Sequence, residues 1–280
     1  MPFQQSLTAG VQNCWLSFLD PYNFAIGNST TAPSAGSIQG SYPFIGIQQM
    51  PTGISEGEAV PIEGDDTTLG SILFAANAPR EFLMNFGQGD QDLDALLQGT
   101  LVSSEGDISM GLADPAHPVY PTVCLIVQAR SIKRDSGVAG QAAWSGLIYP
   151  VVQIQPLNRE QFQGRAAGSY RYKGVAQEAG HRPWGVTIAE AVDGDIGSYA
   201  FDFKSDNPIT MDAFTANGVT TSWVLNKTPV SSSPTTNKTR PYIERILSTP
   251  SSVTPATKTV VLPSAFTSGN RGVILYEYSA

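Results

Sequence analysis

The hydrophobic pattern of the chain is clearest between residues 121 and 180. The odd positions from Val123 to Ala129 are all apolar, whereas Thr122, Gln128 and Arg130 occupy the opposite face. A period of two indicates a β-strand, and this pattern predicts a strand with one face in a core. Cys124 lies inside this strand, where we expect it to be a small buried hydrophobic residue.

Two further strands follow the first. The second has the apolar face Trp144, Ile148, Val152 and Ile154, opposed by Ser145, Gln153 and Gln155. The third spans Ala166–Gln177, with Tyr170 and Tyr172 on one side and Arg171 and Lys173 on the other. Three such strands in succession predict an antiparallel sheet that begins with a long hairpin.

The connection between the first two strands is predicted to be a polar loop of eleven residues, Ser131–Gln141. It contains the letters IKRDSGVAGQ and is rich in charge and glycine. A hairpin needs a connection of only about two to five residues. We therefore expect the tip of this hairpin to have a role beyond turning the chain.

One short helix is predicted over residues 90–99, DQDLDALLQG. Asp90 is a favourable N-cap, two further aspartates lie in the first turn, and Gly99 provides a left-handed stop. Leu93, Leu96 and Leu97 form one apolar stripe with helical spacing, which must pack on a sheet.

The rest of the pattern predicts short strands. They are expected at 44–48, 59–62 (an edge strand), 67–76, 101–112, 184–191 and 199–203, with four more in WVL, YIERIL, TKTVVL and RGVILYEY after residue 218. The fold class is therefore mainly β with one short α-helix.

Three regions are predicted along the chain: an N-terminal arm (1–40), a main β domain (41–205) and a small C-terminal β module (206–280). The apolar cluster at 11–27 fits a short helix stopped by Pro21, a strand, or an arm laid across a neighbouring molecule. Residues 205–218, with the sequence SDNPITMDAFTANG, are typical of a boundary. The C-terminal module is either a separate domain or an extension of the first sheet.

Charged residues make up only 14% of the chain, and the net charge is −8. A surface with so few charges is weakly protected against self-association. The acidic balance argues against attraction to nucleic acid or to an anionic membrane. The first residues lack the features of a signal peptide, and no run reaches the ~18 apolar residues of a membrane span, so we expect synthesis in the cytoplasm and no membrane span.

No pattern in the sequence predicts catalysis. His117 and His181 have no ligand partner at metal-binding spacing, and no nucleophile or phosphate-binding motif occurs. We therefore expect no enzyme activity, no metal and no cofactor. A glycosidase-like carboxylate pair stays open, because acids are plentiful and nothing selects two of them.

Arg130, Lys133 and Arg134 form the one basic cluster. It either keeps the hairpin tip soluble or contacts an acidic surface on a neighbouring copy. The residues that we predict at this interface are Arg130, Lys133, Arg134, Asp135 and Gln141, and on the acidic side Glu56, Glu58, Asp65 and Asp66.

The order of these elements resembles the major tail tube proteins of long-tailed, siphovirus-type bacteriophages. Three segments carry the resemblance: REFLMNFGQGDQDLDALLQGTLV, CLIVQARSIKRDSGVAGQAAWSGLIYPVVQIQPLN, and FQGRAAGSYRYKGVAQEAG followed by WGVTIAEA. They lie within residues 40–205, and the last 65 or so residues resemble the extra β module that many such proteins append. The first 40 residues and the segment 41–66 are longer than in compact members of the family.

The resemblance implies a barrel-like β-sandwich with a flanking helix, built six to a ring, with rings stacked into a hollow tube. The function implied is that of a structural virion protein of the phage tail, through which double-stranded DNA passes without specific binding. The implied partners are other copies of the chain, a tape measure protein and a tail terminator protein. Two alternatives remain: another head, neck or decoration protein, and a carbohydrate-binding adhesin module.

Overall fold

The fold is described from a computed structural model of the chain. The described residues are 6–44, 47–49, 58–64, 67–74, 80–86, 91–100, 103–105, 108–110, 118–135, 138–157, 170–177, 179, 200–233 and 238–279. Within them the protein is mainly β, with several antiparallel sheets, one short α-helix and one 3-10 turn. The predicted fold class is confirmed at this level.

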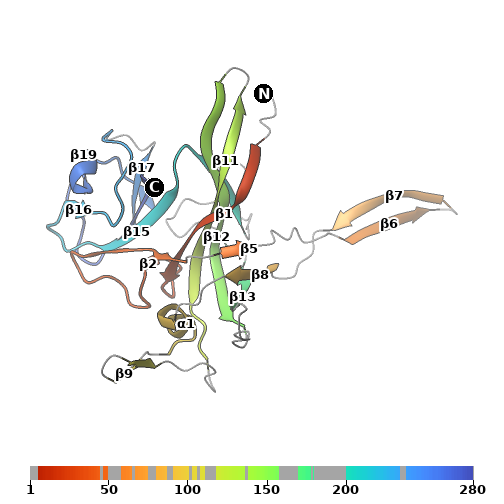
Figure 1. Cartoon of the computed structure of the whole chain (residues 1–280), viewed down its shortest axis with the longest axis horizontal. Coiled ribbons are helices and arrows are strands. Elements are labelled where there is room, and N and C mark those ends of the chain that lie inside the picture. The colour runs from red at the N-terminus through yellow and green to blue at the C-terminus, as the bar shows by residue number, and fades with distance from the viewer. Residues whose placement is uncertain are drawn as a thin grey trace.

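The largest sheet contains nine strands in the described part of the chain (Figure 1). They are β1 (Ser6–Leu19), β2 (Ala25–Gly27), β4 (Tyr42–Pro43), β5 (Ile47–Gln49), β8 (Arg80–Phe86), β11 (Thr122–Asp135), β12 (Val138–Pro156), β13 (Tyr170–Ala176) and β14 (Phe201–Ser205). The order is β2-β1-β11-β12-β13-β8-β5, with β4 paired to β1 and β14 paired to β12. No hydrogen-bonded ladder joins β5 back to β1 in these residues, so the sheet is not a closed barrel.

A second group of strands comes from the C-terminal part of the chain, with β3 added from the N-terminal part. A five-stranded sheet has the order β18-β17-β21-β15-β3. Its strands are β3 (Ile38–Gly40), β15 (Ile209–Thr215), β17 (Thr239–Ile243), β18 (Ile246–Leu247) and β21 (Arg271–Glu277). A three-stranded sheet, β16 (Ser222–Val224), β20 (Thr259–Val261) and β19 (Ser252–Thr254), lies beside the 3-10 turn η1 (Pro255–Thr257).

Two hairpins form sheets of their own. β6 (Glu58–Gly64) pairs with β7 (Thr67–Phe74), and β9 (Ser103–Glu105) pairs with β10 (Ile108–Met110). In Figure 1 the β6–β7 hairpin extends far from the body of the molecule. These strands confirm the predictions at 59–62, 67–76 and 101–112, while the strand expected at 184–191 lies outside the described residues.

The N-terminal apolar cluster forms a strand. β1 pairs with β11 over its whole length, from Ser6 opposite Lys133 to Phe18 opposite Val123. Of the three readings of this cluster, the structure therefore shows a strand of the main sheet. The domain division at residues 40 and 205 stays a prediction.

Both faces of β11 are buried between Val123 and Gln128, and the expectation of a single buried face was wrong there. Val123, Leu125 and Val127 pack into one core together with α1, β8 and β13. Cys124 and Ile126 pack into a second core, formed with the C-terminal sheets. The reason is tertiary: those sheets cover the face of β11 that would otherwise meet solvent. The burial of Cys124 is as predicted.

The predicted apolar face of β12 is divided between the two cores. Ile148 lies in the core shared with the C-terminal sheets, whereas Val152 and Ile154 lie in the core under the helix. The ladder to β11 contains an irregularity at this point, where Val123 pairs with Val152 but Leu125 pairs with Tyr149. One extra residue in β12 reverses which positions face which side, so the even positions do not share a face along the strand.

The same irregularity marks a change of partner along β12. Residues 144–148 pair with β14, and residues 152–156 pair with β13. β13 then pairs with β8, and its Tyr172 is buried.

The helix α1 (Gln91–Leu97) is present where the sequence predicts it, and Gly99 follows it with φ of +67°. Leu93 and Leu97 are fully buried against the sheet, whereas Leu96 is only partly buried. The buried carboxylate of Asp94 accepts a hydrogen bond of 2.6 Å from the Tyr172 hydroxyl. The predicted N-cap, Asp90, lies outside the described residues.

The predicted boundary at 205–218 contains the central strand β15. It pairs with β21 on one side and β3 on the other, and residues 209–214 are all buried. The sequence pattern misses this strand because Thr210 and Asp212 are polar residues buried inside it. The four predicted C-terminal strands are confirmed as β16, β17 with β18, β20 and β21.

Candidate functional site

The predicted interface residues of the central hairpin lie on paired strands and not in a loop. Lys133 pairs with Gln141, Arg134 pairs with Ala139, and Asp135 pairs with Val138. The prediction of an eleven-residue loop is therefore wrong. The ladder between β11 and β12 continues to Asp135 and Val138, and the connection between them, residues 136–137, is not described. The pattern failed because a ribbon that extends beyond the core has no apolar face, so its strands resemble a loop in sequence.

This end of the hairpin is a three-stranded ribbon, because β1 pairs along β11 as far as Lys133. Figure 1 shows β11 and β12 extending together beyond the C-terminal sheets, with β1 beside them. Arg130, where the ribbon leaves the core, is exposed and lies opposite Trp144 of β12. The structure thus brings the predicted basic positions together at one end of the molecule.

The predicted acidic positions are placed elsewhere. Glu58 is the first residue of β6 and pairs with Phe74, while Glu56, Asp65 and Asp66 lie outside the described residues. Figure 1 shows the β6–β7 hairpin and the end of the β11–β12 hairpin extending in different directions from the body. Contact between these two hairpins therefore requires two copies of the chain.

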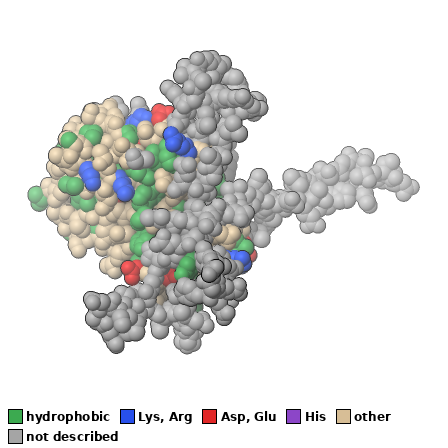
Figure 2. All heavy atoms as spheres, in the orientation of Figure 1, with side chains coloured by type: hydrophobic (Ala, Val, Ile, Leu, Met, Phe, Trp, Pro, Cys, Tyr) green, Lys and Arg blue, Asp and Glu red, His purple; other side chains and the backbone are tan. Residues whose placement is uncertain are grey.

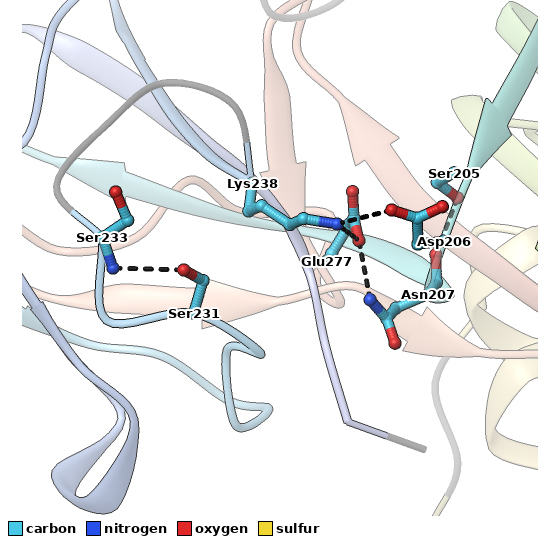
Figure 3. A network of polar contacts seen from close by, with 7 residues as sticks. All are labelled: Ser205, Asp206, Asn207, Ser231, Ser233, Lys238 and Glu277. Atoms are coloured by element: carbon cyan, nitrogen blue, oxygen red, sulfur yellow. Dashed lines mark hydrogen bonds and ion pairs between the residues drawn. The ribbon is translucent and has the colours of Figure 1, made fainter.

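A polar network joins three segments that are far apart in the sequence (Figure 3). Lys238 forms ion pairs of 3.1 Å with Asp206 and 3.0 Å with Glu277, and Glu277 accepts a hydrogen bond of 2.9 Å from Asn207. Burial by itself lowers the pKa of Lys238, but the two carboxylates outweigh it and the net shift is upward. The network ties the connection between β14 and β15 to the ends of β17 and β21.

A second polar cluster ties the turn after β1 to the C-terminal sheet. Asp20 is buried and forms an ion pair with Arg271 of β21, and its other oxygen accepts backbone hydrogen bonds from Tyr22 and Phe24. Arg245 donates a hydrogen bond of 2.7 Å to the Tyr22 carbonyl. Its guanidinium also lies 4.4 Å from the centre of the Phe24 ring.

Asp212 is the most perturbed carboxyl group among the described residues. Its side chain is buried, and one oxygen accepts hydrogen bonds from the Asn226 backbone N–H and the Tyr276 hydroxyl, at 2.8 and 3.0 Å. Desolvation raises the pKa of Asp212 to about 6, although these hydrogen bonds and Lys227 oppose the shift. Through these hydrogen bonds, Asp212 is positioned to hold β15, β21 and the turn at 226 together.

The described residues contain no cluster of three or more His, Cys, Asp and Glu side chains that could hold a metal ion. Cys14 and Cys124 are both buried, and burial raises the pKa of both thiols, which suppresses thiolate chemistry. His117 and His181 lie outside the described residues. No helix in the described part of the chain is long and apolar enough to span a membrane.

The three polar clusters were missed by sequence reasoning, since their members come from segments up to about 250 residues apart. Only unusual positions, such as an acid inside the apolar run of β15, could have indicated one of them. No protein-family model matches this sequence, and no curated protein shows significant similarity to it.

Proposed function

We propose that this protein is a structural virion protein, the tail tube subunit of a long-tailed bacteriophage, which assembles into stacked rings. The observation that carries the proposal is the β1–β11–β12 ribbon. It extends well beyond the two cores, and its sequence there has no continuous apolar face of its own. A ribbon of this kind is stabilised by packing on other protein surfaces.

The open main sheet supports the same proposal. Its terminal strand β5 has a hydrogen-bonded partner on only one side among the described strands. Exposed strand edges favour pairing with another chain, and closure into a ring removes them. In the proposed assembly about six copies complete a barrel-like wall from their sandwich domains, and a tape measure protein and a tail terminator protein contact the tube.

Charge also favours a passive conduit. The net charge of −8 gives DNA phosphates little to bind, so DNA passes through the lumen without specific contacts. The proposed activity is therefore assembly in the virion without catalysis, metal or cofactor.

The proposed contact between copies uses the two hairpins that extend from the body. The basic ribbon end, with Arg130, Lys133 and Arg134, lies against the acidic segment of a neighbour, residues 56–66. Opposite charges at this contact predict that assembly weakens as salt screens them, over about 8 Å at physiological ionic strength.

The test is assembly of the purified chain as a function of concentration. Sedimentation velocity should show growth into large species, and negative-stain electron microscopy should show rings or tubes of uniform diameter. Lys133→Glu together with Arg134→Glu should reduce assembly while the circular dichroism spectrum stays that of the parent. A protein that remains monomeric up to millimolar concentration would contradict the proposal.

A further inference from the structure

The connection between β15 and β16 contains Asn217 followed by Gly218, the one Asn-Gly pair in the sequence. Gly218 is exposed, with φ of +84°. Apart from its chain neighbours, a Cβ at this glycine would meet only atoms of Ser268, at 3.8 Å. Glycine in this position favours deamidation of the preceding asparagine, because no side chain screens its backbone nitrogen from the amide. The pair is therefore a candidate modification site.

Deamidation at this pair needs only water. The Gly218 backbone nitrogen attacks Cγ of Asn217, so the N–Cγ bond forms and the Cγ–Nδ2 bond breaks. A proton passes through solvent from the glycine nitrogen to Nδ2, which leaves as ammonia. Water then opens the resulting succinimide ring at either carbonyl. One opening gives aspartate, and the other gives isoaspartate, in which the main chain runs through the former side chain and gains a methylene group.

The turn holds the reactive amide by three hydrogen bonds. Oδ1 of Asn217 accepts from the backbone N–H groups of Val219, at 3.0 Å, and Thr220, at 2.7 Å. Nδ2 donates to the Thr220 hydroxyl at 2.8 Å. Ring closure requires the amide to rotate and Nδ2 to leave, so these bonds oppose the reaction.

Neighbouring backbone restricts the same amide. It lies against Gly36, where a Cβ would overlap Nδ2 of Asn217. Gly36 itself donates a hydrogen bond of 2.7 Å to the Thr215 carbonyl. The backbone of Ala216, the residue before Asn217, is hydrogen-bonded to residues 269–270. The amide therefore gains freedom to rotate when this end of the C-terminal sheets opens.

We propose that Asn217 is a modification site controlled by this turn, at which deamidation is suppressed while the turn is closed and proceeds when the turn opens. The site lies in the C-terminal module and does not depend on the proposed assembly.

The two products have different consequences for the turn. Aspartate keeps an oxygen that accepts from Val219 and Thr220, and its second oxygen accepts a hydrogen bond from the Thr220 hydroxyl, which is both donor and acceptor. The turn therefore closes again around aspartate. Isoaspartate lengthens the main chain between β15 and β16, so the same hydrogen bonds do not re-form. Formation of isoaspartate thus makes the opening of this turn irreversible.

The first test compares deamidation rates in the folded protein and in guanidinium at the same mildly alkaline pH. The described surface on the side of the C-terminal sheets is mostly uncharged (Figure 2), so one added carboxylate is readily separated by ion exchange. Peptide mass spectrometry then assigns it to residue 217. Folding should slow the reaction at Asn217 at least about a hundredfold, because three hydrogen bonds must break. Asn28, an exposed asparagine followed by serine, is the internal control and should be slowed much less.

The second test changes the partner of Nδ2. Thr220→Val keeps the shape of the side chain but removes the hydroxyl, and should speed deamidation of the folded protein about fivefold. Thr220→Ser keeps the hydroxyl and should behave like the parent. In guanidinium both variants should deamidate at the parent's rate, and circular dichroism checks that both fold.

The third test compares the two products. Asn217→Asp should unfold at the same urea concentration as the parent, whereas the isoaspartate form, separated after ageing, should unfold at a lower concentration.

Equal rates in the folded and denatured parent would overturn control by the turn. An unchanged rate in Thr220→Val would overturn the role of the hydrogen bond. A slower rate in that variant would show that the turn promotes ring closure, with its donors to Oδ1 acting as an oxyanion hole. An isoaspartate form as stable as the parent would overturn the irreversible step.

Discussion

At the scale of single residues, three strand glycines share one arrangement. Gly146 pairs with Phe203, Gly174 with Phe82, and Gly272 with Phe214, each on a neighbouring strand. In all three places a Cβ added to the glycine would overlap the phenylalanine ring. The ring lies across the glycine backbone, which fills the space that a side chain would otherwise occupy and shields the ladder from water.

This arrangement predicts that Gly174→Val destabilises the protein by about 1–3 kcal/mol, the usual cost of overpacking. Phe82→Ala should also destabilise it, since the ring is buried. The double variant should be less destabilised than the sum of the two, because removing the ring makes room for the valine. Urea unfolding of the four proteins measures this coupling, and strictly additive effects would show that the ring and the glycine do not depend on each other.

Asp212 predicts a pH dependence of stability. Its pKa is raised from 3.8 to about 6 in the folded protein, so the fold prefers the protonated carboxyl. The stability that Asp212 contributes is therefore largest below pH 4 and is lost as the pH rises through 6, by roughly 3 kcal/mol at most. Tyr276 stays neutral over this range because its own pKa is raised, so it does not contribute to the change.

The Asp212→Asn variant isolates this effect. The neutral amide cannot ionise, so the difference in unfolding free energy between variant and parent should shift in favour of the variant between pH 4.5 and pH 7. Comparison with the parent at each pH cancels the titration of the other acids. Urea unfolding at the two pH values is the measurement, and a constant difference would contradict the raised pKa.

At the scale of elements, the helix shows how far a stripe of leucines can be interpreted from sequence. Helical spacing assigns Leu93, Leu96 and Leu97 to one face, but the structure fully buries only Leu93 and Leu97. Leu97→Ala should therefore cost about 2–5 kcal/mol of stability. Leu96→Ala serves as the matched control on the same helix and should cost about 1 kcal/mol, since its side chain is only partly buried. Equal losses in thermal or urea unfolding would mean that the helix packs with a different face.

At the scale of the whole molecule, the C-terminal module is joined to the main sheet by a shared core and by paired polar groups. Trp15, Cys124 and Ile126 of the main sheet are buried with Trp223, Ile274 and other residues of the module. The buried side chain of Gln128 donates to the Ile209 carbonyl at 2.6 Å and accepts from the Ile209 N–H at 2.7 Å. The Gln128 side chain therefore bonds both backbone polar groups of Ile209, as a neighbouring strand would. The C-terminal module is thus joined to the main sheet by hydrogen bonds as well as by the shared core.

Deleting residues 206–280 should therefore prevent folding of the remaining chain and not release a smaller stable domain. The truncation would expose Cys124 and Ile126 of β11 and leave the amide of Gln128 without these partners, at the cost of an unsatisfied polar group. Solubility and the cooperativity of urea unfolding are the measurements, with the full chain as control. A soluble truncated protein that unfolds cooperatively would instead support the division at residue 205.

Much of the local structure was determined by the sequence alone, because it depends on short-range chemistry. Period two predicts β13 and β21, the aspartates and leucines predict α1, and Gly99 occupies the left-handed position at its end. The burial of Cys124 follows from its place in an apolar strand. In each case, a residue and its neighbours within a few positions are sufficient for the prediction.

What only the tertiary structure decided concerns contacts between distant segments. Residues 131–135 and 138–141 are strands because they pair with each other and because β1 pairs with residues 131–133, although their sequence has no face for a core. β15 is an interior strand because β21 and β3 flank it and because Tyr276 and Asn226 donate hydrogen bonds to one oxygen of its buried Asp212. Both faces of β11 are buried because a module about 80 residues later covers one of them. These segments are stabilised by hydrogen-bond partners and covering sheets that lie far away in the sequence. Such distant contacts do not change the hydrophobic pattern of the segment itself, so the pattern cannot predict them.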